Sequence, residues 1–179
     1  METTPVPVFF TSALLGAHKG KPERMKSSPE DVADRAERYF ADGHNCAMAV
    51  LRAVAESLDL ACPACIPAVA LGLGGGVGHT GRICGAATGA VMALSLAVNR
   101  FVDGSLVDKK DETVTLAAGL VNRFVEAFGS AECAVLLGFS WAESGAVERF
   151  HRENRKERTC TPAVRWAAAE ACRIAVGLR

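Results

Sequence analysis

Residues 28–58 read SPEDVADRAERYFADGHNCAMAVLRAVAESL, and this stretch decides the fold because it holds two helix signatures in succession. Ser28 supplies a hydroxyl cap, and Pro29 stands at a position where no backbone donor is needed. Acids follow in the first turn, and apolar residues recur at helical spacing as far as Asp42 and Gly43. Asn45 can cap a second helix over residues 46–58, which is apolar nearly all round, so we expect it to be buried centrally.

The rest of the chain shows further helical patterns and no clean alternation of period two. The further helices are expected over about residues 83–101, 108–129, 130–138, 144–156 and 161–177. Their expected first or capping residues are Asp108, Ser130, Ser144 and Thr161. The sequence therefore predicts an all-α, single-domain bundle of about six to seven helices, with a glycine-rich loop before the long helix at 83–101.

Composition limits the function classes. The 179 residues carry no net formal charge, so nothing points to nucleic acid or an anionic membrane as a partner. The apolar stretch 6–17 is too short to span a bilayer and lacks a basic flank, so we expect a cytoplasmic protein without an export signal. Residues 1–28 are expected to form a poorly ordered arm, and residues 29–179 the helical domain.

The sequence contains seven cysteines, an odd number. In a cytoplasmic protein they are more often reduced, metal-bound or catalytic than paired in structural disulfides. Four of them fall at predicted helix starts: Cys46, Cys84, Cys133 and Cys160. Free backbone N–H groups and the helix dipole favour a thiolate there, so we expect the pKa of these thiols to be lowered. Scattered buried cysteines are the alternative interpretation of the same pattern.

The other cysteines and the histidines have simpler interpretations. Cys172 lies in the middle of a predicted helix, which favours core packing. Cys62 and Cys65 form a C-P-x-C pair without the strand–helix context of a thioredoxin site, so we interpret them as an accessory dithiol. His44 and His79 lie near the first two cysteines in sequence and could assist a metal site, although loop histidines are more often surface residues.

The segment GLGGGVGHTGRICGAATGAVMAL at 72–94 allows two interpretations. Gly76, Gly78 and Gly81 match G-x-G-x-x-G, the pattern of a dinucleotide-binding loop, but no series of strand–helix units accompanies them. The better hypothesis is that these glycines shape the backbone around Cys84 and direct amides toward sulfur. The following helix then has a bare surface for close packing, made by Gly85, Ala86 and Gly89.

Four segments together resemble a known family: GHNCAMAVL at 43–51, residues 72–94, AECAVLLG at 131–138 and TCTPAV at 159–164. They are similar to the redox-active proteins named C_GCAxxG_C_C, and the resemblance extends over about residues 30–176. It implies a helical fold and makes Cys46, Cys84, Cys133 and Cys160 the four family cysteines. Some relatives form part of a multihaem cytochrome in which the cysteines are associated with a 2Fe-2S cluster. No C-x-x-C-H segment occurs here, so no haem is expected.

We therefore expect a small redox protein, an electron-transfer protein or oxidoreductase, whose four cysteines converge on one site. They would bind a 2Fe-2S iron–sulfur cluster or act by thiol–disulfide exchange. A structural zinc-binding module is the alternative, and a nucleotide-binding protein a more remote one. The expected partner is an unidentified redox protein, and the sequence also allows a homodimer.

Overall fold

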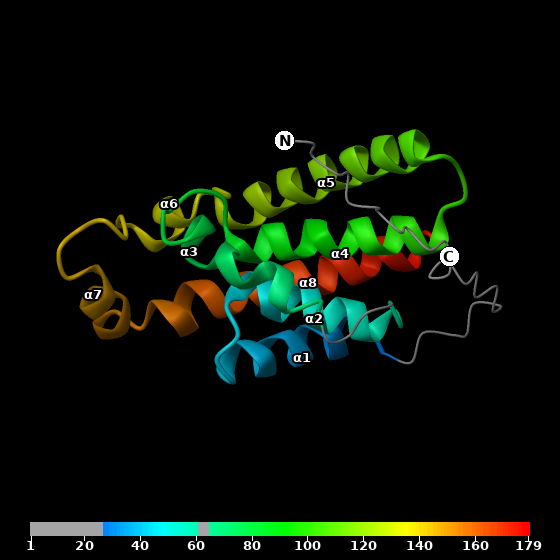
Figure 1. Ribbon diagram of the computed structural model, residues 1–179. Coiled ribbons are helices and arrows are strands. Elements are labelled where there is room, and N and C mark those ends of the chain that lie inside the picture. Colours follow the sequence, from blue (N-terminus) through cyan, green and yellow to red (C-terminus); the bar gives the residue numbers. More distant parts are fainter. Residues whose placement is uncertain (1–26, 61–64) are drawn as a thin grey trace, which may run out of the picture.

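The computed structural model describes residues 27–60 and 65–179, and these form an all-α fold (Figure 1). Most of the expected arm at 1–28, and also Cys62, lie outside the described residues. The helices are α1 (Pro29–Ala41), α2 (Cys46–Ser57), α3 (Gly74–Val77), α4 (Gly85–Phe101), α5 (Leu106–Phe128), α6 (Cys133–Leu137), α7 (Ala146–Arg152) and α8 (Thr161–Val176). A 3-10 turn, η2 (Ala68–Leu73), and a π-helical turn, η3 (Lys156–Cys160), complete the described elements.

The prediction of an all-α bundle is confirmed. Within residues 27–60 and 65–179 there is no strand, only an isolated antiparallel bridge between Ile83 and Glu132. The helix number exceeds the expected six to seven because the glycine loop itself contains the four-residue helix α3. In this described part of the chain, no helix is both long and apolar enough to cross a membrane.

Two helices begin with reciprocal capping boxes. The Ser28 hydroxyl accepts from the backbone N–H of Asp31 at 3.1 Å, and the Asp31 carboxylate accepts from the N–H of Ser28 at 2.8 Å. Ser105 and Asp108 form the same arrangement at the start of α5. The expected start at Asp108 is therefore wrong: Asp108 lies in the first turn, and Ser105 is the cap, because a serine and an acid three residues apart satisfy two donors at once.

The other expected caps at the C-terminal half are also wrong. Ser130 accepts a turn hydrogen bond from the N–H of Glu132, and α6 begins only at residue 133. The helix expected from Ser144 begins after Gly145 and ends at residue 152. Thr161 is no cap, because it continues in helical conformation from the π-helical turn η3. Sequence patterns locate helix ends poorly where a neighbouring turn supplies the missing hydrogen bonds.

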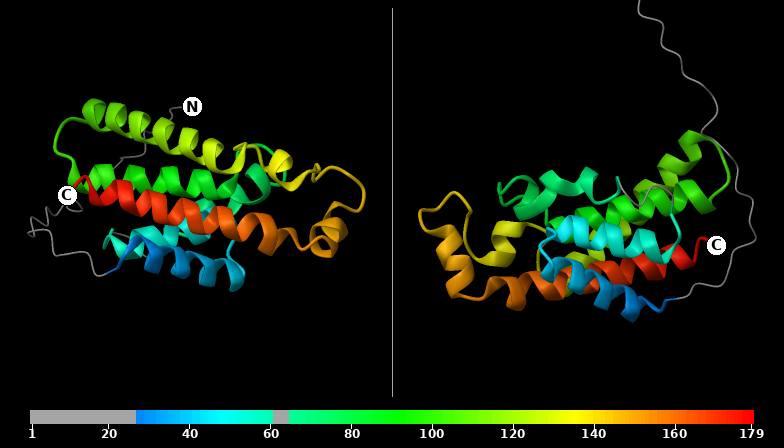
Figure 2. Two further views of the ribbon diagram at one scale, coloured as in Figure 1. Left: turned by 180° about the vertical axis from the view of Figure 1, so that it is seen from behind. Right: turned by 60° about the horizontal axis from the view of Figure 1, so that its bottom comes forward.

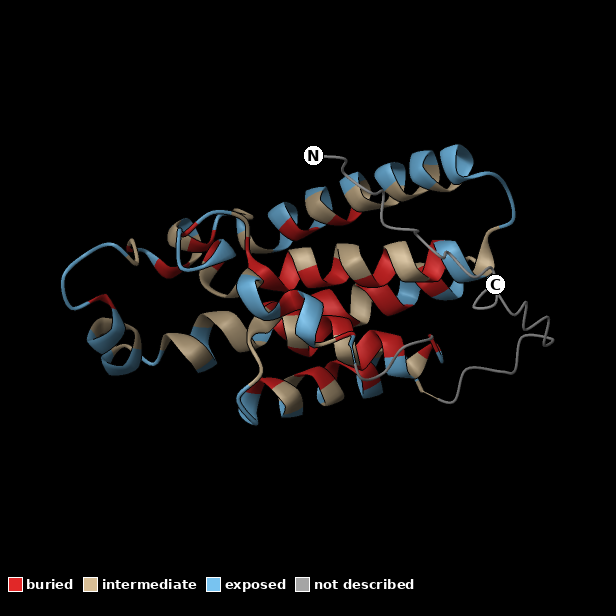
Figure 3. Ribbon diagram, in the orientation of Figure 1, coloured by how far each residue is buried: buried red, intermediate tan, exposed pale blue. Residues whose placement is uncertain are grey.

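The bundle has α2, α4 and α8 at its centre. These three helices begin at the same end of the molecule, and α1 and α5 run in the opposite direction along its two sides (Figures 1 and 2). The buried residues concentrate on the three central helices, whereas much of α5 is exposed (Figure 3). The expectation that the helix after Asn45 is central is therefore confirmed, since seven of its residues are buried.

Small residues allow α2 and α4 to approach closely. A Cβ atom added at Gly89 would lie 2.5 Å from the carbonyl oxygen of Ala47 and 2.9 Å from its Cα. Alanines supply much of the buried surface of both helices. The expected bare surface on the helix after the loop is confirmed, and it packs against the start of α2.

This close approach predicts that Gly89→Ala is destabilising although alanine favours helices. The added methyl group must separate α2 from α4, and such overpacking costs about 1–3 kcal/mol. Unfolding in urea followed by circular dichroism measures the change in the free energy of unfolding.

Gly119→Ala is the matched control, because a Cβ there would meet only the guanidinium group of Arg123 at 3.5 Å. We expect that variant to be more stable by about 0.5–1 kcal/mol, the usual gain from removing a helical glycine. Equal effects of the two substitutions would contradict the proposed tight contact.

Candidate four-cysteine site

The four family cysteines lie at the end of the bundle where the three central helices begin. Cys46 is the first residue of α2, and Cys84 immediately precedes α4. Cys133 is the first residue of α6, and Cys160 is the last residue of η3, directly before α8. In Figure 1 these starts gather at the left, beside α3 and α6.

The glycine loop between η2 and α4 wraps around this end. Gly76 is buried and has a φ of +73°, and a Cβ there would lie 2.6 Å from the backbone nitrogen of Arg82 and 2.8 Å from Cys133 Cβ. Gly81 has a φ of +74°, and its Cβ would lie 2.8 Å from that of Ala134. Only glycine fits these two positions, because the backbone is left-handed and the space is taken. The expected role of the glycines in backbone shape is supported.

A short pairing of backbone segments holds Cys84 beside Cys133. The N–H of Cys84 donates to the carbonyl of Ala131 at 2.7 Å, and the N–H of Cys133 donates to that of Arg82, also at 2.7 Å. The N–H of Ala134 donates to the carbonyl of Gly81 at 2.9 Å. The loop and α6 are thus joined by main-chain bonds, which fix two of the four cysteines relative to each other.

Backbone amides surround the sulfur of Cys46. Its thiol receives hydrogen bonds from the N–H groups of Gly75, Ala47 and Gly85, which come from the loop, from α2 and from the start of α4. A Cβ added at Gly85 would overlap Cys46 Sγ. The expectation that loop amides point toward sulfur is supported at Cys46, the cysteine nearest to the α2–α4 contact.

Burial dominates the electrostatics of these thiols. It raises the pKa of Cys84 to about 12, and it also raises the pKa of Cys46, Cys133 and Cys160. The expected lowering by helix starts is therefore wrong for the free thiols, because the cost of burying a thiolate exceeds the stabilisation by nearby amides. Cys160 additionally lies in continuous helical backbone, so no free helix start faces it.

The electrostatic interactions among the four thiols agree with this placement. After burial, a thiolate at Cys46 raises the pKa of the other three, Cys133 raises that of Cys84, and both Cys84 and Cys133 raise that of Cys160. Cys172 is different. Burial raises its pKa to about 11, and the charges that act on it are those of Arg173, Arg179 and Glu30. It is fully buried among apolar residues, as expected.

The remaining candidate residues lie outside this group. Cys65 is disulfide-bonded, whereas the four family cysteines and Cys172 form no disulfide. His44 contacts the Arg52 guanidinium at 3.1 Å, and His79 stacks on the ring of Trp141 with 4.6 Å between centroids. In the described part of the chain, no three Cys, His, Asp or Glu side chains are placed to hold one metal ion together.

The arrangement offers little to a nucleotide. The segment before the loop is the 3-10 turn η2 and not a strand. The N–H groups of Gly78, Gly81 and Arg82 donate to carbonyls of the loop at 2.8–3.1 Å, and that of Gly75 donates to Cys46. A phosphate cradle needs amides that are free to donate, and these amides already have acceptors.

Trp141 is a site residue that the sequence analysis missed. Its ring packs against the apolar cluster that contains Cys133, and its indole N–H opposes the effect of burial on the pKa of that thiol. The residue lies in the loop between α6 and α7, eight positions after the cysteine, where no periodicity links the two. The only feature of the sequence that could have pointed to Trp141 is its position shortly after the short helix that begins with Cys133.

The fold and the site together define a helical protein with four neighbouring cysteines at one end of its bundle. The family model described as "Putative redox-active protein (C_GCAxxG_C_C)" matches residues 44–174, and the chain belongs to this family. An uncharacterized protein of Archaeoglobus fulgidus is 28% identical over 112 residues, which cover 60% of this chain and 74% of that protein. No solved structure matches the chain.

The packing around Cys46 predicts the effect of Gly85→Ala. The new methyl group must displace the sulfur, so we expect the free energy of unfolding to fall by about 1–3 kcal/mol. Cys46 should also react faster with iodoacetamide, because the displaced sulfur loses the packing that buries it and raises its pKa. Mass spectrometry of the alkylated native protein measures the rate at each cysteine.

Gly78→Ala separates this contact from backbone strain. Gly78 has a φ of +61° but open space around its Cβ position, so the substitution should cost about 1–2 kcal/mol and leave the alkylation of Cys46 unchanged. If Gly78→Ala accelerates that alkylation as much as Gly85→Ala does, the effect comes from general loosening and the prediction fails.

Proposed function

We propose that Cys46, Cys84, Cys133 and Cys160 form one redox site and that this site binds an iron–sulfur cluster of the 2Fe-2S type. The chain would then act as a small electron-transfer protein. The observation that carries the proposal is the placement of the four cysteines at one end of the bundle, where main-chain hydrogen bonds join the glycine loop before Cys84 to the start of α6. Membership of a redox-active family agrees with it.

The chemistry of the site favours a cationic occupant. Four buried or partly buried thiols that oppose one another's ionisation become thiolates together only when a positive charge compensates them. Iron prefers soft sulfur ligands, and four cysteine thiolates are the usual ligand set of a 2Fe-2S cluster. A two-iron cluster divides its ligands between two metal ions, so it does not require all four sulfurs to meet around a single ion. A single zinc ion would need three or four ligands around it, and the described residues contain no such group.

The protein's own groups would prepare the ligands. The N–H groups of Gly75, Ala47 and Gly85 already donate to Cys46, and hydrogen bonds to ligand sulfur stabilise negative charge there. The starts of α2 and α4 add the positive ends of two helix dipoles. A bound cluster would supply one-electron transfer, and burial of Cys84 and Cys133 would keep water from the ligands.

Thiol–disulfide exchange is the second candidate, favoured by the backbone pairing that holds Cys84 beside Cys133. These two thiols would form one disulfide and release two electrons and two protons. A disulfide in a partner protein would take them up and become two thiols. The raised pKa of both thiols, caused first by burial, makes them slow nucleophiles and weighs against this candidate.

Anaerobic purification of the full chain tests the proposal. We expect a brown protein with visible charge-transfer absorption and about two iron and two sulfide ions per chain. Alanine substitution of any of the four family cysteines should lower the iron content and the absorption. Cys172→Ala is the matched control and should keep both, because Cys172 is fully buried and the charges that act on its pKa are those of Arg173, Arg179 and Glu30.

Other outcomes identify the alternatives. A colourless protein with one zinc per chain would support a structural zinc module. A metal-free chain that loses two thiols on oxidation would support the exchange mechanism. Iron retained in full by both Cys133→Ala and Cys160→Ala would show that these two cysteines are not ligands and would overturn the shared site.

A further inference from the structure

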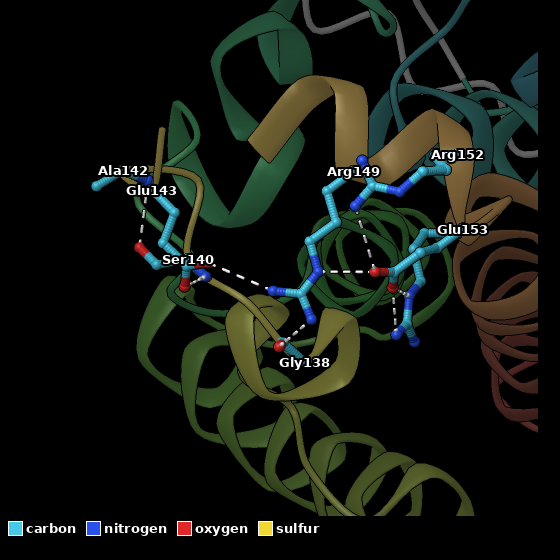
Figure 4. Close-up of polar contacts among 8 residues, drawn as sticks. Gly138, Ser140, Ala142, Glu143, Arg149, Arg152 and Glu153 are labelled. Carbon is cyan, nitrogen blue, oxygen red and sulfur yellow. Dashed lines mark hydrogen bonds and ion pairs between the residues drawn. The ribbon is translucent and has the colours of Figure 1, made fainter. Parts of the chain in front are cut away.

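Residues 138–155, which connect α6 to η3, extend from the four-cysteine end of the bundle and return to it (Figure 1), and we call them the cover segment. Figure 4 shows Arg149 at its centre. The Arg149 guanidinium donates to Glu153 at 2.8 Å, to Glu143 at 3.4 Å and to the carbonyl of Gly138 at 3.4 Å. One side chain therefore joins the loop after α6 to α7 and the residues that follow it. The ends of the segment adjoin α6, which carries Cys133, and η3, which carries Cys160.

Three aromatic contacts fix the orientation of Trp141 in this segment. The ring lies edge-on to Phe139 with 5.7 Å between centroids, and tilted to Phe150 with 5.2 Å. On another side it stacks on His79 at 4.6 Å, and His79 itself packs on Gly75 of the glycine loop. The indole is thus held between the cover segment and the loop that carries the amides around Cys46.

The indole Nε1 atom of Trp141 is buried and has no acceptor at hydrogen-bonding geometry. It is the only buried side-chain nitrogen or oxygen without a partner among residues 27–60 and 65–179. Cys133 belongs to the apolar cluster against which the Trp141 ring packs, and the indole N–H lowers the pKa of its thiol against the effect of burial. Buried donors are nearly always satisfied in folded proteins, so a single exception beside a ligand candidate points to an acceptor that exists in another state of the site.

We propose that Trp141 is a positioning residue of the four-cysteine site, whose indole N–H donates to the Cys133 sulfur once that sulfur carries negative charge. This inference rests on the proposed function, because a neutral thiol is a weak acceptor and a metal-bound thiolate is a strong one. The indole keeps its proton throughout. Its role is to favour the state with more negative charge on sulfur, which is the reduced state, and so to raise the reduction potential.

Trp141→Phe tests this role, because it keeps an aromatic ring in the apolar cluster and removes the N–H donor. In the anaerobically reconstituted full chain, we expect the iron and sulfide content to equal that of the unmodified protein. The midpoint potential, measured by optical redox titration, should become more negative. Trp166→Phe is the control: Trp166 packs edge-on against Phe124 and Phe128, and its replacement should leave the potential unchanged.

An unchanged potential in Trp141→Phe with full iron content would overturn the inference and leave the proposed function standing. If neither the unmodified protein nor its variants bind iron, the result would count against the cluster. The indole is then tested in the metal-free reduced protein. The chain has two tryptophans, so its ¹⁵N–¹H spectrum contains two indole signals, and Trp141→Phe identifies one of them.

We expect that signal to exchange slowly with deuterated water and to move in Cys133→Ala but not in Cys172→Ala. Fast exchange, or a signal that Cys133→Ala leaves in place, would show that the indole does not face this sulfur and would overturn the inference whatever the metal content.

Discussion

The close contact between the starts of α2 and α4 is the constraint on which the rest of the structure depends. Gly85 and Gly89 leave no side chain between the two helices, so the backbone of Ala47 lies directly against α4. The contact places the N–H of Gly85 on the sulfur of Cys46. It also fixes where the glycine loop ends, and therefore where Cys84 lies. A larger residue at either glycine would move α2 away from α4, and it would thereby move Cys46 away from Cys84.

Burial and backbone hydrogen bonding act against each other at this end of the bundle. The amides around Cys46 favour a thiolate, but the surrounding apolar side chains disfavour it more strongly, so the pKa is raised. Compensating positive charge would reverse that balance without any change in the fold. The same low-dielectric surroundings that keep the free thiols protonated would then strengthen each bond between amide and ligand sulfur.

Helix periodicity and capping residues were sufficient to predict the all-α fold and the starts of the first two helices. Ser28 and Asn45 are unambiguous caps, because each is followed at once by a helical apolar pattern. The start of α8 was mispredicted because a π-helical turn continues through Cys160, and local sequence does not encode that continuation. The pKa direction was wrong because burial depends on tertiary packing. Trp141 was missed because the chain folds back on itself between α6 and η3, and no spacing rule describes that return.

The cover segment has one further property, which follows from its place between Cys133 and Cys160. Any group or bond that joins these two sulfurs closes the intervening chain into a ring. Ring closure lowers the conformational entropy of the unfolded chain, and the effect grows with the number of residues enclosed. A joined site would thus act as a cross-link for the part of the protein with the smallest apolar core, the cluster of Cys133, Leu137, Phe139 and Ala146. The local stability of the cover segment would then depend on whether the sulfurs are joined. A redox or metal-binding event would therefore change the rate at which this segment opens.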